Sequence, residues 1–371
     1  MFTIDKNILD SNMHLYITED RFYWVDSHKD WVLGAHGPLN INQLLNIWNI
    51  NIPTIVDKKY VAMKRQLNLS GSTPWPKLIG KRIVRKKLNN IILELKKFFK
   101  DYKNDEYIRR HQVIQNFLWS LAPIPIDKTS FDNAKAFADT QGYLKSIVPY
   151  QQEVLSDYFI SPPRYSRETK TGRCKVSSGI NVVGLKKSLR NIAINCRQID
   201  FSSMEPRFLL ATNGDHVEGD IYEWIGKKAN LKGSRTKQKI EIISSMYGSK
   251  KILEVDKILR IEEKISEIKK NKKGNMFKNY FGRPIFAEER NDRHLLSLWL
   301  QSSASDAALL AFANFFKYNP KLKPHWVIHD AVIFSGIGNI PDELEITKDL
   351  SLPIKVEDII PDPRKFMEIK K

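Results

Sequence analysis

Two hydrophobic patterns divide the first part of the chain. In residues 1–80, apolar and polar positions alternate in MHLYITEDRFYWVD and DWVLG, which predicts short strands, and NINQLLNIWNI predicts a short helix. Between residues 81 and 115, apolar side chains recur at helical spacing, so we expect an amphipathic helical stretch. Pro74 and Pro76, in GSTPWPK, indicate a linker before that stretch.

The rest of the chain predicts strands that flank a group of helices. NIAINCRQID runs into FSSMEPRFLLA, a pattern typical of a strand that turns into a helix. Residues 127–165 are expected to be helical and connective, and residues 220–315 to form several helices with an exposed loop at KKNKKGN (269–275). HWVIHDAVIFSGIGN and then LSLPIKVE predict strands around a turn, so the pattern favours a mixed α/β fold.

Length and composition indicate a globular protein of two or three subdomains. The 371 residues are 42% hydrophobic, which suffices for an apolar core without disulfide bonds. Cys174 and Cys196 have neither CxxC nor Cys/His metal spacing, which argues for a reducing compartment and against a zinc site. No signal pattern opens the chain, and DAALLAFANFF is too short to span a bilayer. We therefore expect a cytoplasmic protein, in the host cytoplasm if its source is viral, without a membrane partner.

A formal net charge of +18 favours a polyanionic partner. Nucleic acid is the commonest such partner, although an anionic membrane or solubility alone would also suit a basic chain. In residues 81–115, Lys and Arg outnumber Asp and Glu by 11 to 4. Two interpretations stay open: a solvated surface helix, or a helical subdomain that grips a duplex through phosphate contacts of Arg85, Lys86, Lys96 and Lys97.

Two aspartates are candidate metal ligands. Asp200 ends a predicted strand, and its carboxylate and the carbonyl of Phe201 are oxygen ligands of the kind that Mg²⁺ prefers. Asp330 lies in WVIHDAVIF, where a polar His-Asp pair interrupts apolar residues and is expected at a turn. Two aspartates on separate strands are the minimal scaffold for two metal ions that activate a hydroxyl and neutralise a leaving pyrophosphate. Either aspartate alone is more typical of a turn or cap, so the hypothesis depends on the pair.

The segment SRTKQKIEIISSMYG predicts a helix with a row of functional side chains. Arg235, Lys239, Ile243 and Tyr247 are spaced by four and share one face, and Gly248 is expected to end the helix. The two cations would bind a triphosphate with the aid of the helix dipole, and the aromatic ring would stack on a base pair. A row of Lys and Arg usually faces solvent, but the Arg-x3-Lys-x7-Tyr-Gly pattern is more specific than that.

These three segments, in this order, resemble motifs A, B and C of family A DNA polymerases, the group of bacterial DNA polymerase I and related phage enzymes. DFSSMEPR is similar to D-Y-S-Q-I-E-L-R, the basic helix to R-x3-K-x3-F-x3-YG, and HDAVIF to the HDE motif. Further similarity comes from TGRCKVSSGINVVGLKKSLRNI, GDIYEWIG, RHLLSLWLQSSASDAALLAF and LPIKVE. The resemblance covers about residues 140–358.

The resemblance implies an α/β (α+β) right-hand polymerase with a mixed-sheet palm, helical fingers and a reduced helical thumb. It implies template-directed extension of a primer 3′-hydroxyl with dNTPs under two Mg²⁺ ions, for which Mn²⁺ is an alternative. Primer–template DNA, dNTPs and other replication proteins are the implied partners. The expected divisions are an accessory region (1–80), a basic thumb-like region (81–165), the palm with motif A (166–207), the fingers with motif B (208–299) and the palm with motif C (300–371).

Residue roles follow from the same resemblance. The implied metal ligands are Asp200, Phe201 and Asp330. The implied nucleotide contacts are Arg235, Lys239, Ile243, Tyr247 and Glu205, where a Glu excludes ribonucleotides. The implied primer–template contacts are Arg173, Arg293, Gln301 and His329.

Three departures from the family pattern keep alternatives open. Ala331 stands where the family usually has Glu, Ile243 replaces an aromatic residue, and Ser297 replaces an Asn. One alternative is a nucleic-acid-binding replication protein that has lost catalysis, for which Ala331 is the main support. Another is an RNA polymerase or primase of the related single-subunit type, because YGSK (247–250) is similar to that type, whereas Glu205 favours DNA synthesis.

The sequence also predicts that the protein lacks a proofreading activity, and it indicates the kind of genetic element that encodes the protein. Residues 1–130 contain no carboxylate cluster of the kind that a proofreading exonuclease needs, so we expect no 3′→5′ proofreading. The small size and the Lys/Asn/Ile-rich composition favour a phage, plasmid or other mobile-element replication enzyme.

Overall fold

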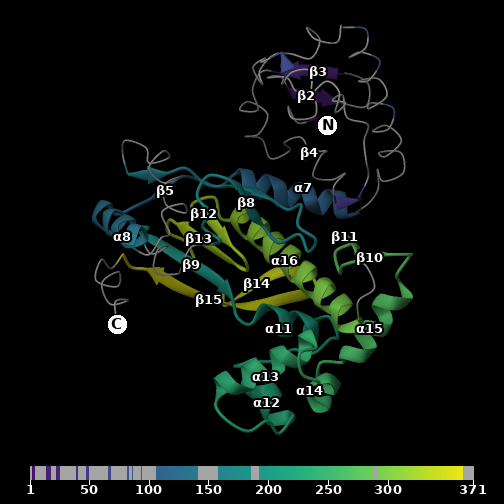
Figure 1. The fold of residues 1–371 in the computed structure, drawn as a ribbon. Helices are drawn as coiled ribbons and strands as arrows, with labels where there is room; N and C mark the ends of the chain where they lie inside the picture. The colour runs from purple at the N-terminus through teal and green to yellow at the C-terminus, as the bar shows by residue number, and fades with distance from the viewer. Residues whose placement is uncertain are drawn as a thin grey trace. The chain divides into compact units, whose positions relative to one another are not determined.

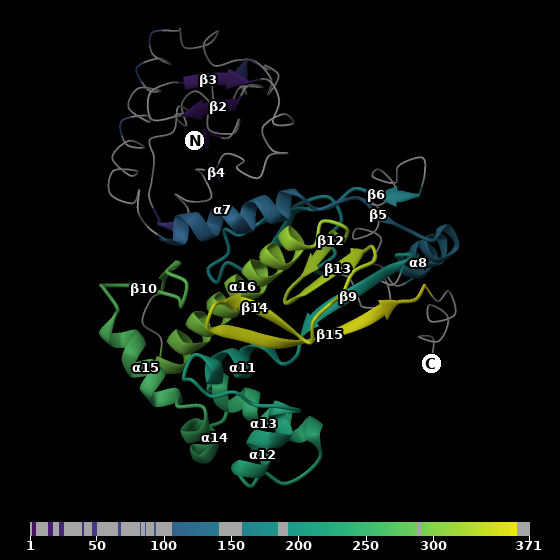
Figure 2. The same cartoon turned by 180° about the vertical axis from the view of Figure 1, so that it is seen from behind.

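A computed structural model gives the fold of the protein, which Figure 1 shows from one side and Figure 2 from behind. The chain separates into two units, Met1–Trp119 and Ser120–Lys371. The structure describes residues 2–4, 14–17, 22–25, 39–40, 47–49, 66–67, 82, 86, 93, 106–140, 158–184, 192–287 and 291–361.

The described part of the first unit contains a small sheet and a helix. The sheet has the strand order β3-β2-β1-β4, with β1 (Phe2–Ile4), β2 (His14–Ile17), β3 (Phe22–Val25) and β4 (Leu39–Asn40). The antiparallel pair β2 and β3 confirms the prediction of short strands in MHLYITEDRFYWVD. Helix α7 (Glu106–Trp119) buries Tyr107, whose ring lies 5.5 Å from that of Trp48 between centroids.

Most of the basic stretch at residues 81–115 falls outside the described residues, and Arg85, Lys96 and Lys97 are among those not described. Arg82, Lys86 and Leu93 are described, and each is helical and exposed. The helical prediction is therefore supported at these positions and in α7, while the phosphate contacts stay a prediction.

The second unit is built on a five-stranded antiparallel sheet of order β12-β13-β9-β15-β14. Its central strand β9 buries Cys196, Ile199 and Phe201 and leaves Asp200 half-buried. This confirms the predicted strand at NIAINCRQID and the strands predicted at the C-terminal end of the chain. The bounds are β9 (Cys196–Phe201), β12 (Lys323–Ile328), β13 (Ala331–Ser335), β14 (Glu343–Thr347) and β15 (Leu350–Ile359).

A long apolar helix, α16 (Asp292–Tyr318), packs against this sheet. The Phe312 and Phe201 rings lie 5.4 Å apart between centroids, and those of Phe316 and Phe334 lie 5.8 Å apart. The apolar segment DAALLAFANFF, expected to be too short for a membrane span, is part of this 27-residue helix. Within the described residues α16 alone is long and apolar enough to cross a membrane, but 83% of its most apolar window is buried, as in the core helix of a folded domain.

Between β9 and α16 the chain forms the helix predicted at FSSMEPRFLLA and the helices predicted for residues 220–315, together with a two-stranded sheet at residues 276–286 that was not predicted. These helices lie together below the five-stranded sheet in Figure 1. Helix α15 continues to Lys270, so the expected loop at 269–275 begins two residues later than predicted. The elements are α11 (Met204–Ala211), α12 (Ile221–Lys228), α13 (Arg235–Tyr247), α14 (Leu253–Ile258), α15 (Ile261–Lys270), β10 (Met276–Lys278) and β11 (Pro284–Phe286).

Short elements before β9 cover the edge strand β12. The Tyr165 hydroxyl accepts a hydrogen bond from the Val327 N–H (2.9 Å) and donates one to the Val327 carbonyl (2.8 Å), and Ala122 N–H donates to the Pro324 carbonyl (2.8 Å). These bonds satisfy backbone groups that an edge strand would otherwise expose. The elements are β5 (Ile124–Pro125), α8 (Lys128–Thr140), β6 (Phe159–Ile160), β7 (Arg164–Ser166) and β8 (Lys175–Ser178).

Candidate active site

The two candidate metal ligands are neighbours at one end of the central sheet. Asp200 is the penultimate residue of β9 and pairs in register with Ala331, the first residue of β13. Asp330 occupies the two-residue turn between Ile328 and Ala331, and its carbonyl accepts a hydrogen bond of 3.2 Å from the Phe201 N–H. Both carboxylates are half-buried. The predicted strand end and the predicted hairpin turn are therefore adjacent in space.

The environment of Asp330 disfavours an uncompensated negative charge. Burial raises the pKa of the Asp330 carboxyl above its ordinary value, and a backbone hydrogen bond together with His329, Arg173 and Lys239 opposes that rise only in part. A cation bound beside the carboxylate would favour its ionised form. Lys239 belongs to α13 and lines the same cavity as Asp200, so this helix approaches the sheet end.

The donors at this end fit a hard divalent cation. Carboxylate and carbonyl oxygens are the ligands that Mg²⁺ and Mn²⁺ prefer, and Asp200, Asp330 and Phe201 offer both kinds. Within the described residues no group of three or more His, Cys, Asp or Glu residues could hold a metal, and Ala331 supplies no carboxylate beside Asp200. A cation held here needs further ligands from water or from a bound phosphate.

Helix α13 has the bounds that the sequence predicts. Ser234 is its N-cap and accepts a hydrogen bond from the Lys237 N–H at 3.5 Å, and Gly248 ends it in the left-handed conformation with φ 79°. A Cβ at Gly248 would lie 2.6 Å from the Arg293 Cβ, so both the backbone conformation and the space require glycine. Arg235 and Lys239 are exposed at the start of the helix, and Ile243 and Tyr247 are half-buried further along it.

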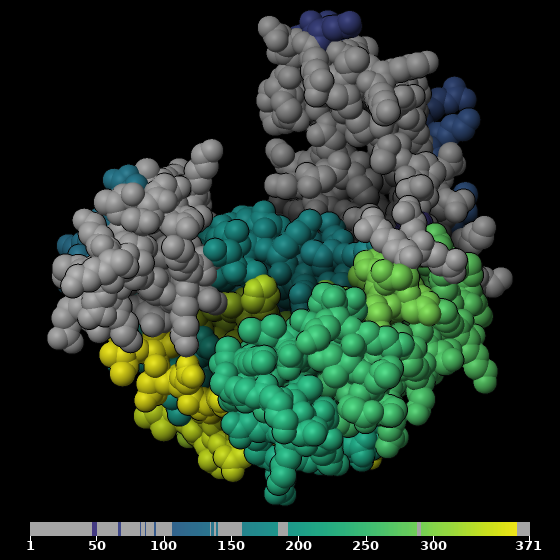
Figure 3. Space-filling view, turned by 60° about the horizontal axis from the view of Figure 1, so that its bottom comes forward, coloured from purple at the N-terminus to yellow at the C-terminus, as the bar shows by residue number. Residues whose placement is uncertain are grey.

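A cavity of about 850 Å³, here called the large cavity, lies between the sheet end and α13. Asp200 and Phe201 line it from β9, Arg235 and Lys239 line it from α13, and Lys355 lines it from β15. Figure 3 shows the face on which the helices after α11 (green) lie beside the C-terminal strands (yellow). The large cavity thus brings a carboxylate and two of the predicted phosphate-binding cations to one space.

Arg235 has an anionic partner within the protein. Its guanidinium donates to the Asp220 carboxylate, with an Nε to Oδ2 distance of 2.7 Å. Asp220 also caps α12 by accepting from the backbone N–H groups of Tyr222 (2.9 Å) and Glu223 (3.1 Å). Burial alone would raise the pKa of Asp220, but the hydrogen bonds from Arg235 and from these N–H groups hold it below its ordinary value.

The Tyr222 ring orients both cations. The Arg235 guanidinium carbon lies 5.5 Å, and the Lys239 ammonium nitrogen 5.4 Å, from the ring centroid, within the range of a cation–π contact. Arg235 and Lys239 are therefore held side by side at the wall of the large cavity.

Glu205 links three segments near the sheet end. The Arg173 guanidinium donates to one of its oxygens at 2.6 Å, and the Tyr247 hydroxyl donates to the other. Burial, followed by the nearby Glu205 carboxylate, raises the pKa of the Tyr247 hydroxyl, so the tyrosine stays protonated and donates. A small cavity of about 50 Å³ is lined by Arg173, Glu205, Gln301, His329 and Asp330, so five sequence-predicted residues meet there.

Arg293 lies elsewhere. Its guanidinium donates to the Asp256 carboxylate, to Glu262 (3.1 Å) and to the Ser245 carbonyl (3.2 Å), among helices α13 to α15. It lines neither cavity. The implied contact of Arg293 with DNA stays a prediction.

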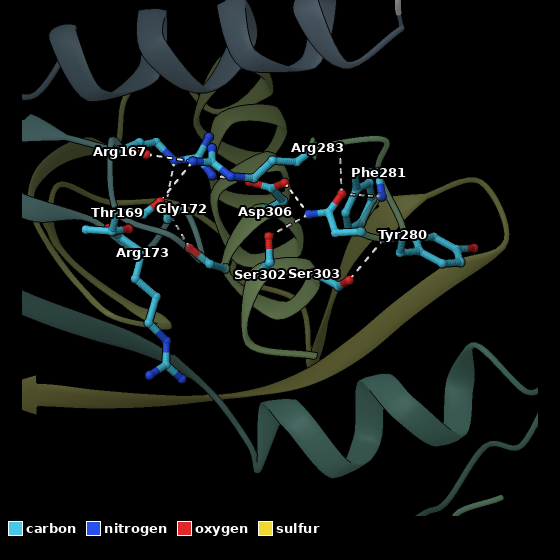
Figure 4. A network of polar contacts seen from close by, with 12 residues as sticks. Arg167, Thr169, Gly172, Arg173, Tyr280, Phe281, Arg283, Ser302, Ser303 and Asp306 are labelled. Atoms are coloured by element: carbon cyan, nitrogen blue, oxygen red, sulfur yellow. Dashed lines mark hydrogen bonds and ion pairs between the residues drawn. The ribbon is translucent and has the colours of Figure 1, made fainter. Parts of the chain in front are cut away.

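A buried polar network that the sequence patterns did not reveal supports the segment before Arg173 (Figure 4). Asp306 is fully buried within α16 and accepts from the Arg167 guanidinium and from the Asn279 amide (2.7 Å). Arg283 donates to the carbonyls of Arg167 (2.8 Å) and Thr169 (3.1 Å). The one sign of this network in the sequence is Asp306, a carboxylate within an otherwise apolar helical segment.

This network fixes the conformation of Gly172, which precedes Arg173. Arg167 Nε donates to the Gly172 carbonyl at 3.0 Å, and Gly172 has φ 70°. A Cβ there would lie 2.8 Å from the Arg283 guanidinium. Figure 4 shows the Arg173 side chain extending away from the network, so the buried groups position its backbone and leave the guanidinium free to reach Glu205.

The comparisons with known proteins identify a similar fold. No protein-family model and no curated protein sequence matches the chain. Among solved structures, the chain is similar to the polymerase domain of Pol1 from M. smegmatis, solved in complex with a DNA primer–template and a dNTP. The TM-score is 0.56 at 11% sequence identity, over 94% of this chain and 93% of that chain. The protein therefore has a mixed α/β fold similar to that of a DNA polymerase domain.

Proposed function

We propose that the protein is a template-directed DNA polymerase that extends a primer 3′-hydroxyl with dNTPs. The observation that carries the proposal is the adjacency of Asp200 and Asp330 at the sheet end, where Asp200 lines the same cavity as Arg235 and Lys239. Oxygen ligands for divalent ions thus lie next to cations for a triphosphate, as nucleotidyl transfer requires. The likeness to a polymerase domain solved with a primer–template and a dNTP supports the same function.

In this proposal the chain's own residues bind and orient the reactants. Asp200, Asp330 and the Phe201 carbonyl would hold two Mg²⁺ or Mn²⁺ ions. When bound, such ions supply the charge that activates the 3′-hydroxyl and neutralises the leaving pyrophosphate. Arg235 and Lys239 bind the phosphates, and for this Arg235 exchanges the Asp220 carboxylate for a phosphate oxygen.

The remaining predicted residues select the sugar and contact the primer–template. Glu205, held by Arg173 and Tyr247, restricts the space beneath the sugar and excludes ribonucleotides, and Ile243 contacts the same nucleotide from α13. Tyr247 stacks at the insertion site. Primer–template contacts near the 3′ end come from Arg173, Arg293, Gln301 and His329.

The proposal extends to the organisation of the whole chain as a family A enzyme. Residues 166–207 and 300–371 form the palm, 208–299 the fingers, 81–165 a thumb-like region and 1–80 an accessory region. Arg85, Lys86, Lys96 and Lys97 contact duplex phosphates, and other replication proteins are further partners. The enzyme works in the cytoplasm for a phage or other mobile element and has no proofreading activity.

Primer extension on defined templates tests this function. We expect purified protein with Mg²⁺ to extend a primed DNA template with dNTPs, and to extend neither an unprimed template nor a primer supplied only with NTPs. Synthesis from NTPs on an unprimed template would instead identify an RNA polymerase or primase. A mismatched 3′ end should not be shortened; metal-dependent shortening that survives Asp330→Ala would show a separate exonuclease.

One observation favours a second candidate, a DNA-binding replication protein without catalysis. Ala331 stands in register with Asp200, so the sheet end holds two carboxylates and not three. The same assay separates this candidate, because such a protein would bind the primer–template but incorporate no nucleotide with either Mg²⁺ or Mn²⁺.

A further inference from the structure

Lys355 lies directly opposite Asp200 in the sheet. Strand β15 pairs with β9 so that Lys355 and Asp200 are partners, and β13 pairs with β9 on its other side so that Ala331 and Asp200 are partners. Directly paired residues on neighbouring strands project to the same face of a sheet, with Cβ atoms about 5 Å apart. Ala331, Asp200 and Lys355 therefore form a row across three strands, with the ammonium group on the same face as the metal-binding carboxylate.

Lys355 lines the large cavity together with the cations of α13. The cavity is bounded by Asp200 and Lys355 on the sheet and by Arg235 and Lys239 on the helix. Lys355 is exposed, and in the part of the chain that the structure describes no ion pair involves it. Arg235, by contrast, is paired with Asp220. The Lys355 ammonium therefore need not exchange one of the described carboxylates for an anion that enters the cavity.

Acidic residues line the same cavity as well, namely Asp215, Glu218, Asp220 and Glu343. Asp220 is paired with Arg235, and Asp215 is paired with Arg260 at 3.3 Å. Two of the cavity's carboxylates are thus already matched by cations of the neighbouring helices.

We propose that Lys355 is a third phosphate-binding cation of the large cavity, which contacts the β- and γ-phosphates of the incoming nucleoside triphosphate and then the pyrophosphate product. This inference rests on the proposed function. A polyphosphate bound to a divalent ion at Asp200 lies within reach of the ammonium on the neighbouring strand. With alanine at 331, the row across the sheet carries one negative and one positive charge, which suits an anionic ligand better than a row of carboxylates would.

Lys355→Ala and Lys355→Gln remove the charge, Lys355→Arg keeps it, and Lys348→Ala is the matched control. Lys348 is an exposed lysine in the turn between β14 and β15 and lines neither cavity. We expect loss of the Lys355 charge to raise both the KM for dNTP and the inhibition constant for inorganic pyrophosphate about 10-fold, as for loss of a hydrogen bond to a charged group. Lys355→Arg and Lys348→Ala should stay within about 3-fold of the original protein.

A binding measurement without chemistry completes the test. The complex with a dideoxy-terminated primer should bind dNTP about 10-fold more weakly after Lys355→Ala, whereas its affinity for the primer–template should not change. If Lys355→Ala does not fold, as judged by circular dichroism, Lys355→Gln gives the result. Unchanged KM, pyrophosphate inhibition and dNTP binding in a protein that extends primers would overturn the inference alone. A wild-type protein that neither extends primers nor binds dNTP would overturn the proposed function instead.

Discussion

Arg235 has to exchange one anion for another if it binds a triphosphate, because it is paired with Asp220 in the structure. Asp220→Asn should weaken that pair and still cap α12, since Asn is as good an N-cap as Asp. We expect the KM for dNTP to fall by roughly 2- to 5-fold, in line with a partly exposed ion pair worth up to about 1 kcal/mol.

Asp215→Asn is the control for this change, because Asp215 lines the same cavity and is paired with Arg260 instead. Its KM for dNTP should match that of the original protein. A KM that rises after Asp220→Asn would mean that Asp220 helps to bind the nucleotide and does not compete for Arg235.

In the proposed function, Glu205 is the residue on which the choice of sugar depends. Arg173 and Tyr247 hold both of its oxygens, so its side chain has one position at the sheet end. Glu205→Ala should raise the use of NTP relative to dNTP by about 10-fold or more, which corresponds to about 1.4 kcal/mol of discrimination. The measurement is the ratio of kcat/KM for the two nucleotides.

Tyr247→Phe serves as the control, because it removes the hydroxyl that bonds to Glu205 but leaves the carboxylate and the ring. Its NTP to dNTP ratio should change less than that of Glu205→Ala. An unchanged ratio in Glu205→Ala, or a wild-type protein that prefers NTPs, would contradict the sugar-gate role and favour RNA synthesis.

At the scale of elements, the segments with a strong local pattern were predictable. The β9–α11 segment, the α13 helix with its glycine cap, and the β12–β13 hairpin each follow from periodicity and turn residues within fewer than 20 positions. The adjacency of Lys355 and Asp200 was not predictable, because it depends on the register of strands far apart in the sequence. Nor was the Arg167–Asp306 pair, whose partners are separated by 139 positions.

The buried network around Asp306 should contribute strongly to the stability of the second unit. Asp306→Ala would leave the Arg167 guanidinium, 2% exposed, without its carboxylate partner. Breaking a buried ion pair by removing one partner costs about 3–5 kcal/mol. We expect a loss of that size in the free energy of unfolding, measured by urea denaturation.

Glu254→Ala is the matched control, because it removes a carboxylate from an exposed ion pair with Lys257 on α14. We expect Glu254→Ala to lower the free energy of unfolding by less than about 1 kcal/mol. If Asp306→Ala destabilises the protein no more than Glu254→Ala does, the network does not support the segment that carries Arg173.

For the whole molecule, net charge is the property that follows most directly from the sequence. The net charge of +18 predicts attraction to DNA, and the basic stretch at residues 81–115, with 11 Lys and Arg against 4 Asp and Glu, contributes to it. Changing Arg85, Lys86, Lys96 and Lys97 together to Gln should weaken primer–template binding. The slope of log affinity against log salt should become shallower by about 0.9 for each phosphate that the protein no longer neutralises.

Single-turnover incorporation at saturating DNA is the control for these four substitutions, and its rate should stay near that of the original protein. If the salt dependence of primer–template affinity does not change, this stretch faces solvent and another surface binds the duplex.

The polymerase-like fold was predictable from three short segments, even though the solved domain to which the chain is similar shares 11% of its residues. In the proposed function those segments carry the chemistry, and chemistry restricts sequence more than packing does. The first unit was less predictable, because residues 1–80 contain no motif, and alternating apolar positions specify strands without specifying how a sheet is arranged.

The most direct test of the proposed active site is primer extension by Asp200→Ala and Asp330→Ala, measured together with primer–template affinity. Both carboxylates are half-buried at the sheet end. Each substitution removes one proposed metal ligand and leaves every Lys and Arg in place. We expect the original protein to extend a primer with Mg²⁺ and dNTPs, and each variant to bind the same DNA within a few-fold but to incorporate no nucleotide. Extension at a near-normal rate by either variant would contradict the assigned active site.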